Sequence, residues 1–157
     1  MTPRTHLRPL LLGWTLLLAP TAGSAPAPKG ISITSIDAQV YDRQKGAIVA
    51  MGEASDPYGM NGDAFIVVKL QGTHDGDAPL KLKLVASAPK ESSEAGDSPG
   101  FKVTQTRDLH ALAENGVTQV PFLIPYSCAS KVTLTATLTG PGVKGSKTLS
   151  TSFPCAE

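Results

Sequence analysis

The sequence is poor in the residue types that most catalytic and metal-binding sites require. Its 157 residues include three histidines, two cysteines and one tryptophan, and these show no zinc or copper spacing. Neither a G-x-S-x-G nucleophile elbow nor a glycine-rich phosphate loop with its lysine is present. Lysine and arginine number 14 against 13 acids, so the chain lacks the basic excess that neutralises nucleic-acid phosphates. We therefore expect no enzymatic activity, no cofactor and no nucleic-acid partner.

Residues 1–24 have the three-part order of a secretory signal peptide. Arg4 and Arg8 precede an apolar run at 10–19, and a stretch of small residues follows it. The run is about half as long as the roughly 20 residues of a membrane-spanning helix, which disfavours the alternative of an uncleaved anchor. No cysteine near the small residues is available to carry a lipid. We predict cleavage after Gly23 or Ser24 and a soluble protein, secreted or periplasmic and not a lipoprotein, without a membrane anchor.

The two cysteines, Cys128 and Cys155, are expected to form a disulfide. Exported proteins meet an oxidising compartment, in which thiols pair. Closing the 27-residue separation would restrict the unfolded chain and contribute roughly 3.5 kcal/mol in the chain-entropy model. Because Cys155 is third from the end, the bond would also hold the last strand in place. A reactive thiol and an intermolecular bridge are the alternatives.

Alternation of apolar and polar residues predicts about eight short strands after an extended leader at 25–30. The predicted strands are residues 31–40, 47–52, 64–70, 80–86, 101–107, 117–124, 132–138 and 147–153. A one-residue slip of phase before Ile36 indicates a bulge or bend, and Pro121 places its strand at a sheet edge or in a kink. Because crossover helices are missing, residues 31–157 are expected to form one antiparallel β-sandwich, with an open barrel as the alternative.

Three segments between the predicted strands carry turn or loop signals. Residues 72–79 contain an Asp/Gly turn that would join 64–70 and 80–86 as a hairpin. Ser87–Gly100 has almost no apolar residue and is expected to be a long mobile loop. Asp108 is suited to capping a single helical turn, which Asn115-Gly116 would end with a left-handed residue.

Two segments resemble immunoglobulin-type proteins. Phe65 to Leu84, with an apolar strand, an Asp/Gly turn and Ala-Pro-Leu-Lys-Leu, resembles a hairpin of secreted bacterial telokin-like, immunoglobulin-like β-sandwiches. Tyr126-Ser127-Cys128 is similar to the Tyr-x-Cys of immunoglobulin strand F, in which the phenol braces the preceding corner. Pro125 beside the tyrosine and the C-terminal position of both cysteines depart from that pattern, so a disulfide here is not the usual bond between the sheets. The resemblance implies architecture only.

Polar loop residues are the candidate binding groups. Hard oxygen ligands on neighbouring loops suit Ca²⁺, although Asp and Gly are also what ordinary turns require. The candidate ligands are Asp56, Asn61 and Asp63 in one loop and Asp75 and Asp77 in another. Tyr58 would either anchor a protein partner or pack onto the end of the sandwich.

These observations favour an exported, non-enzymatic interaction or structural module. It would present loops to an unidentified protein or cell-envelope partner. The first alternative is a secreted enzyme inhibitor that inserts Glu53–Asp63 or Ser87–Gly100 into a target site. The second is an enzyme or calcium-binding sandwich that uses the loop aspartates.

Overall fold

A computed structural model of the chain describes residues 30–54, 62–93 and 96–154. This part of the chain is all-β and contains ten strands. The strands are β1 (Ser32–Asp42), β2 (Ala47–Val49), β3 (Gly62–Gln71), β4 (Asp75–Ala88), β5 (Glu91–Ser93), β6 (Gly96–Ser98), β7 (Phe101–Ala111), β8 (Val117–Pro125), β9 (Ala129–Gly140) and β10 (Val143–Phe153). Over these ranges no helix has the length and apolarity that crossing a membrane requires.

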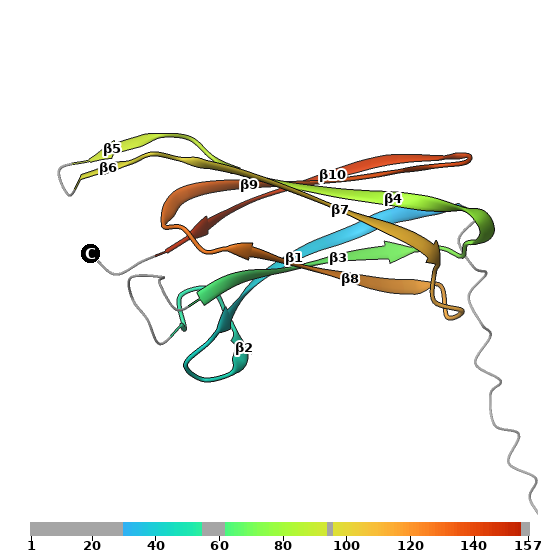
Figure 1. The fold of residues 1–157 in the computed structure, drawn as a ribbon, viewed down its shortest axis with the longest axis horizontal. Coiled ribbons are helices and arrows are strands. Elements are labelled where there is room, and N and C mark those ends of the chain that lie inside the picture. The colour runs from blue at the N-terminus through green and yellow to red at the C-terminus, as the bar shows by residue number, and fades with distance from the viewer. Residues whose placement is uncertain (1–29, 55–61, 94–95, 155–157) are drawn as a thin grey trace, which may run out of the picture.

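The strands form two four-stranded antiparallel sheets that face each other (Figure 1). The first sheet has the order β2-β1-β3-β8, and the second has the order β10-β9-β4-β7. The short strands β5 and β6 pair with each other and extend β4 and β7 as an arm beyond the second sheet (Figure 1). The predicted β-sandwich is confirmed at this level.

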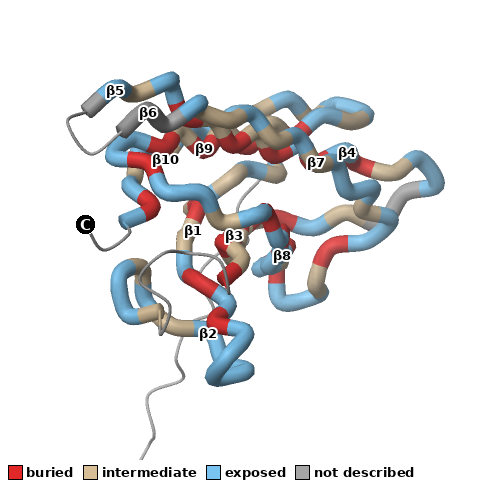
Figure 2. The backbone as a smooth tube through the Cα atoms, turned by 60° about the vertical axis from the view of Figure 1, so that its left-hand side comes forward, coloured by how far each residue is buried: buried red, intermediate tan, exposed pale blue. Residues whose placement is uncertain are grey.

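The core lies between the sheets and is built from every second residue of the strands. In β3 the residues Ala64, Ile66, Val68 and Leu70 are fully buried, and their neighbours are only partly so. Buried stretches recur along the facing strands of both layers (Figure 2). Each large side chain buried in this way contributes about 1.5–3 kcal/mol to folding. The alternation that predicted the strands is therefore the pattern of core burial itself.

Two local predictions are confirmed. The pairing of β1 with β3 shifts register between Ile33 and Ser35, where the sequence slips in phase. β8, which contains Pro121, is an edge strand of the first sheet. Both follow from local chemistry, since an inserted residue reverses the alternation and proline cannot donate to a ladder on both sides.

The predicted hairpin of residues 64–70 and 80–86 is wrong. β3 lies in the first sheet and β4 in the second, so the connection between them crosses from one layer to the other. β3 pairs with β1 and β8, whereas β4 pairs with β7 and β9. Each is a central strand with one apolar face. These apolar faces meet across the core, and the two strands do not pair with each other.

The predicted helical turn after Asp108 is also wrong. Asp108 lies within β7 opposite Lys81, and Leu109 lies opposite Leu80 of β4. Pairing with β4 outweighs the local capping preference, as tertiary context commonly does. The left-handed stop is nevertheless present, because Gly116 has a φ of 77° and its N–H donates to the Ala113 carbonyl oxygen at 2.9 Å.

The segment Ser87–Gly100 is a paired arm and not the long loop that its composition indicates. Glu91 fixes the arm to the start of β9, because its carboxylate accepts the Ser130 hydroxyl at 2.6 Å and the Ser130 N–H at 3.2 Å. These hydrogen bonds lower the pKa of Glu91. Polar, turn-forming residues therefore extend a β-ribbon past the edge of the core.

Candidate interaction face on the first sheet

The outer side of the first sheet carries the exposed apolar residues of the described chain. Four large hydrophobic side chains are substantially exposed: Tyr41 at 36%, Ile48 at 47%, Val117 at 40% and Leu123 at 48%. Tyr41 lies opposite Asp63 of β3 and Ile48 of β2, Leu123 opposite Phe65, and Val117 opposite Gln71. Since residues 64, 66, 68 and 70 of β3 point into the core, the partners of 63, 65 and 71 point outward. All four side chains therefore lie on one face.

These residues belong to a wider apolar band, which we call the apolar face. It consists of Tyr41, Ile48, Phe65, Val67, Val117, Pro121 and Leu123. Phe65 and Val67 are partly buried in its middle, while Pro121 is exposed next to Val67 on β8. Neighbouring strands of a sheet lie about 4.8 Å apart, so side chains at such opposed positions touch or nearly touch. Three opposed pairs result, Tyr41 with Ile48, Phe65 with Leu123 and Val67 with Pro121, whereas Val117 is separated from them by the polar pair of Gln119 and Lys69.

A polar row borders the apolar face. Lys69 Nζ and Asp37 Oδ2 form an ion pair at 2.9 Å, and the Ser35 hydroxyl donates to the same carboxylate oxygen at 3.3 Å. The side chains of the ion pair are about 40% exposed, so water screens them and the pair contributes little to stability. Their charges remain available to a partner that displaces that water.

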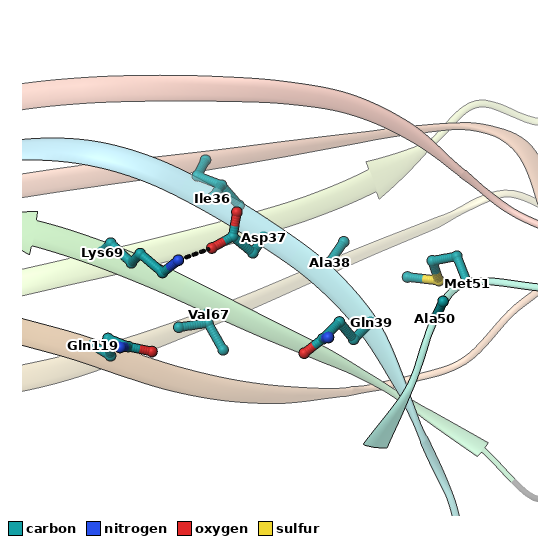
Figure 3. A pocket seen from close by; sticks show the side chains of 9 residues that line it. All are labelled: Ile36, Asp37, Ala38, Gln39, Ala50, Met51, Val67, Lys69 and Gln119. Carbon is teal, nitrogen blue, oxygen red and sulfur yellow. Dashed lines mark ion pairs between the residues drawn. The ribbon is translucent and has the colours of Figure 1, made fainter.

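A hollow of about 550 Å³ opens beside this row. Its lining residues are Ile36, Asp37, Ala38, Gln39, Ala50, Met51, Val67, Lys69 and Gln119 (Figure 3). They come from β1, β3, β8 and the chain after β2. Figure 3 shows Lys69 and Asp37 pointing toward each other on one side and Met51 lying at the other. The lining offers ammonium, carboxylate, amide and apolar groups to a bound molecule.

Of the predicted calcium ligands, Asp63 is already paired. Its carboxylate accepts Arg43 Nη2 at 2.7 Å and Arg43 Nε at 3.1 Å, a two-pronged contact. Asp77 is exposed near the opposite end of β3, and ten residues of strand span roughly 30 Å. Asp63 and Asp77 are thus at opposite ends of the sandwich and do not share a site. No group of three acidic, histidine or cysteine side chains within the described ranges is placed to hold a metal ion.

The remaining candidate residues are only partly described. Asp56, Tyr58 and Asn61 lie outside the described residues, and Asp75 begins β4 without a described side chain. The proposed roles of these residues stay predictions. His74 Nε2 is 3.1 Å from the Ala78 carbonyl oxygen, a hydrogen bond within the connection between the sheets.

Tyr126 binds a different part of the chain from the one that the immunoglobulin resemblance implies. Its hydroxyl donates to the carbonyl oxygen of Pro154 at 2.7 Å, and its ring stacks on Phe153 with centroids 5.1 Å apart. Partial burial raises the pKa of Tyr126 to about 12. The phenol therefore braces the C-terminal end of β10 and not the preceding corner.

Cys128 is exposed immediately before β9. Phe153 pairs with Ala129, so residues just before β9 and just after β10 lie beside each other. This register favours the predicted bond to Cys155, but Cys155 lies outside the described residues and the disulfide stays a prediction.

Sequence reasoning placed the interaction surface in the loops and missed the apolar face. Period-two alternation places Phe65 and Leu123 on the side of their strands that faces away from the core. It does not reveal that the two residues are neighbours on adjacent strands. The available signal was a set of apolar residues in both phases of the strands at 64–70 and 117–124. Comparisons with protein-family models, with curated proteins and with solved structures find no match to this chain.

Proposed function

We propose that the chain is an exported, non-enzymatic interaction module that binds a protein partner through its apolar face. One observation carries the proposal: the four exposed large hydrophobic side chains of the described chain all lie on the outer side of one sheet. Single exposed apolar residues are normal on protein surfaces, whereas their concentration on one face is a feature of binding surfaces. The polar residues Asp37, Lys69 and Gln119 lie beside the central apolar pairs and add hydrophilic contacts of the kind that surround the core of protein interfaces.

The strand order supports an immunoglobulin-like version of the sandwich. Taken in chain order, the seven long strands β1, β3, β4, β7, β8, β9 and β10 correspond to strands A to G. The first sheet then contains A-B-E and the second G-F-C-D, with β2 as a short addition. In immunoglobulin constant domains strand D lies in the same sheet as A, B and E. The proposed relationship therefore requires that strand D, here β7, has moved to the sheet of C, F and G. This architecture carries no particular activity, and the proposal depends on the face.

Export rests on the signal-like order of residues 1–24 and on the pair of cysteines. In that setting a module without a catalytic constellation acts by contact. The contact surface that we propose is the sheet face, in place of the loops that the sequence favours. Tyr41 and Phe65 supply the aromatic anchors that dominate the energetics of many interfaces.

Site-specific photocrosslinking in the producing cells tests this function. A photoreactive phenylalanine at Leu123 samples the apolar face, and one at Thr104 samples the outer side of the second sheet. We expect one discrete crosslinked protein from position 123 and none of the same mass from position 104. The crosslink should fall at least tenfold in a Tyr41→Lys/Ile48→Lys variant, because two charges on the patch oppose its desolvation.

The matched control is Thr104→Lys/Thr106→Lys, which adds the same charge to the other sheet and should leave the crosslink unchanged. Circular dichroism and the melting temperature verify that every variant is folded. Equal crosslinking from both positions, no crosslinking from position 123, or crosslinking only to a second copy of the chain would contradict the proposal.

A further inference from the structure

The outer side of the second sheet has a different and regular chemistry. Each of its four strands contributes four outward residues in register, and we call this set the hydroxyl–lysine grid. Its rows, from β10 through β9 and β4 to β7, are Lys144-Thr139-Lys81-Asp108, Ser146-Thr137-Lys83-Thr106, Thr148-Thr135-Val85-Thr104 and Ser150-Thr133-Ser87-Lys102. Seven threonines, three serines and four lysines make up fourteen of the sixteen positions.

The grid faces water. The intervening residues of β4 and β9, including Leu82, Leu84 and Leu134, are buried in the core, so the grid residues point the opposite way. All four lysines are exposed, and threonine side chains between them are exposed or half-buried. Val85 is the only apolar member. The surface is therefore polar and carries no large hydrophobic side chain.

The grid is positively charged in a chain with almost no net charge. Four lysines and one aspartate give it a formal charge of +3, against +1 for the whole sequence. The ion pairs found in the described ranges involve Arg43, Lys45 and Lys69, which belong to β3 or to the turn after β1, and none involves a grid lysine. Within the described ranges, Arg43, Lys45 and Lys69 are thus paired with carboxylates, whereas the four grid lysines form no ion pair. A face with a net positive charge attracts ions of opposite charge.

The spacing of the grid suits an extended polymer. Side chains on one face recur about every 6.8 Å along a strand and about every 4.8 Å across strands, so the sixteen positions cover roughly 20 by 14 Å. Three of the grid hydroxyls are held by neighbours across the strands: Thr135 Oγ1 and Thr148 Oγ1 are 3.3 Å apart, and the Ser146 hydroxyl donates to the Ala136 carbonyl oxygen at 3.1 Å. Ordering such groups before binding reduces the entropy that binding costs.

We propose that the hydroxyl–lysine grid binds an anionic polysaccharide. The lysine ammonium groups would pair with its acidic groups, and the threonine and serine hydroxyls would exchange hydrogen bonds with its sugar hydroxyls. An anionic bilayer is disfavoured because peripheral membrane binding combines basic groups with inserted apolar ones, and the grid has only Val85. Single-stranded nucleic acid is disfavoured because the grid has neither arginine nor an aromatic ring on which bases stack. This second site lies on the opposite side from the apolar face and does not depend on it.

Affinity measurement on immobilised polygalacturonate tests the inference with the mature chain. We expect binding that weakens at least tenfold between 50 and 500 mM NaCl, as screening of exposed charges requires. The triple variant Lys81→Thr/Lys83→Thr/Lys144→Thr should bind at least tenfold more weakly than the native protein. Immobilised dextran sulfate should also bind and lose affinity in the same variant, whereas neutral dextran should not bind.

Two further variants separate grid chemistry from bulk charge. Lys45→Ser/Lys69→Thr/Lys147→Thr removes three charges that do not belong to the grid, because Lys45 and Lys69 lie on the first-sheet side and Lys147 points to the opposite side of β10 from Ser146 and Thr148, and it should change affinity by less than threefold. Thr106→Val/Thr135→Val/Thr137→Val keeps every charge and the β-branched shape but removes three hydroxyls, and we expect it to bind about threefold to tenfold more weakly. Equal losses in the two lysine variants, unchanged binding in the grid lysine variant, or tighter binding to phosphatidylglycerol vesicles than to either anionic polymer would overturn the proposal.

Discussion

Tyr126 joins two parts of the chain that are 28 residues apart through one hydroxyl group. The phenol donates to Pro154 at 2.7 Å and the ring stacks on Phe153. Burial raises the pKa of Tyr126 from 10.0 to about 12, so the fold favours the neutral phenol. Above pH 10 the unfolded chain loses this proton first. The contribution of Tyr126 to stability is therefore complete below pH 10 and is lost as pH rises through about 12.

We accordingly expect the free energy of unfolding in urea to decline between pH 10 and pH 12 in the native protein. Tyr126→Phe should lower the free energy of unfolding at pH 8 by about 1 kcal/mol, the typical net value of one hydrogen bond. Above pH 10 the free energy of unfolding of this variant should decline less than that of the native protein. Tyr41→Phe, on an exposed side chain, provides the control and should keep the native pH slope. A Tyr126→Phe variant with the full native decline would show that another group is responsible.

Among the elements, the strands that build the core were predictable, whereas β5, β6 and the partners of each strand were not. Leu80, Leu82 and Leu84 mark β4 at period two because one of its faces is buried. Pairing depends on residues far apart in sequence, so β3 and β4 separate into different sheets although only a few residues join them. Asp108 illustrates the same limit, because its capping signal is local and its pairing with Lys81 is not.

The two outer faces were beyond sequence reasoning for a related reason. Alternation places Lys81 and Lys83 together on one side of β4, as expected for a strand with one buried and one solvent-exposed face. β4 lies between β9 and β7, so these lysines belong to the interior of the sheet and not to its edge. Only the register brings Thr137 and Thr106 beside Lys83, and register is set by core packing over the whole sheet.

β8 shows how one element protects the sandwich from other chains. The Leu123 carbonyl oxygen accepts Gln105 Nε2 at 2.6 Å from β7, and β8 pairs with no strand besides β3 in the described sheets. Backbone groups alternate in direction along a strand, so Pro121 and Pro125 face the same free edge as Leu123. Proline has no N–H, and the edge therefore offers fewer donors to a foreign strand.

We expect Pro121→Thr/Pro125→Thr to increase self-association, because it restores two donors to this edge. Sedimentation velocity at several protein concentrations measures the fraction that leaves the native species, which should rise at least twofold at the highest concentration. Pro141→Thr, in the turn between β9 and β10, changes a proline away from the edge and should match the native protein. If the double variant also matches it, the prolines serve the conformation of β8 alone.

At the scale of the whole molecule, the apolar face and the hydroxyl–lysine grid lie on opposite sides of the same core. The apolar face lies on the outer side of the first sheet, and the hydroxyl–lysine grid lies on the outer side of the second (Figure 1). Because the core separates the two faces, a charge added to one face does not touch the residues of the other. A module of this kind can hold a protein on one side and a charged polymer on the other, which makes the two proposals separable by mutation.

The integrity of the sandwich as a whole depends on its C-terminal hairpin, which the predicted Cys128–Cys155 bond would close. Phe153 is fully buried opposite Ala129, and Tyr126 holds the next residue, Pro154. These contacts already align the hairpin, so a disulfide would act chiefly by restricting the unfolded chain.

We expect Cys128→Ser/Cys155→Ser to keep the native circular dichroism spectrum while the free energy of unfolding falls by roughly 3.5 kcal/mol. The denaturant m-value should rise, because an uncrosslinked unfolded chain exposes more surface. Ser127→Ala, beside Cys128, is the control, and two titratable thiols in the unreduced native protein would contradict the bond.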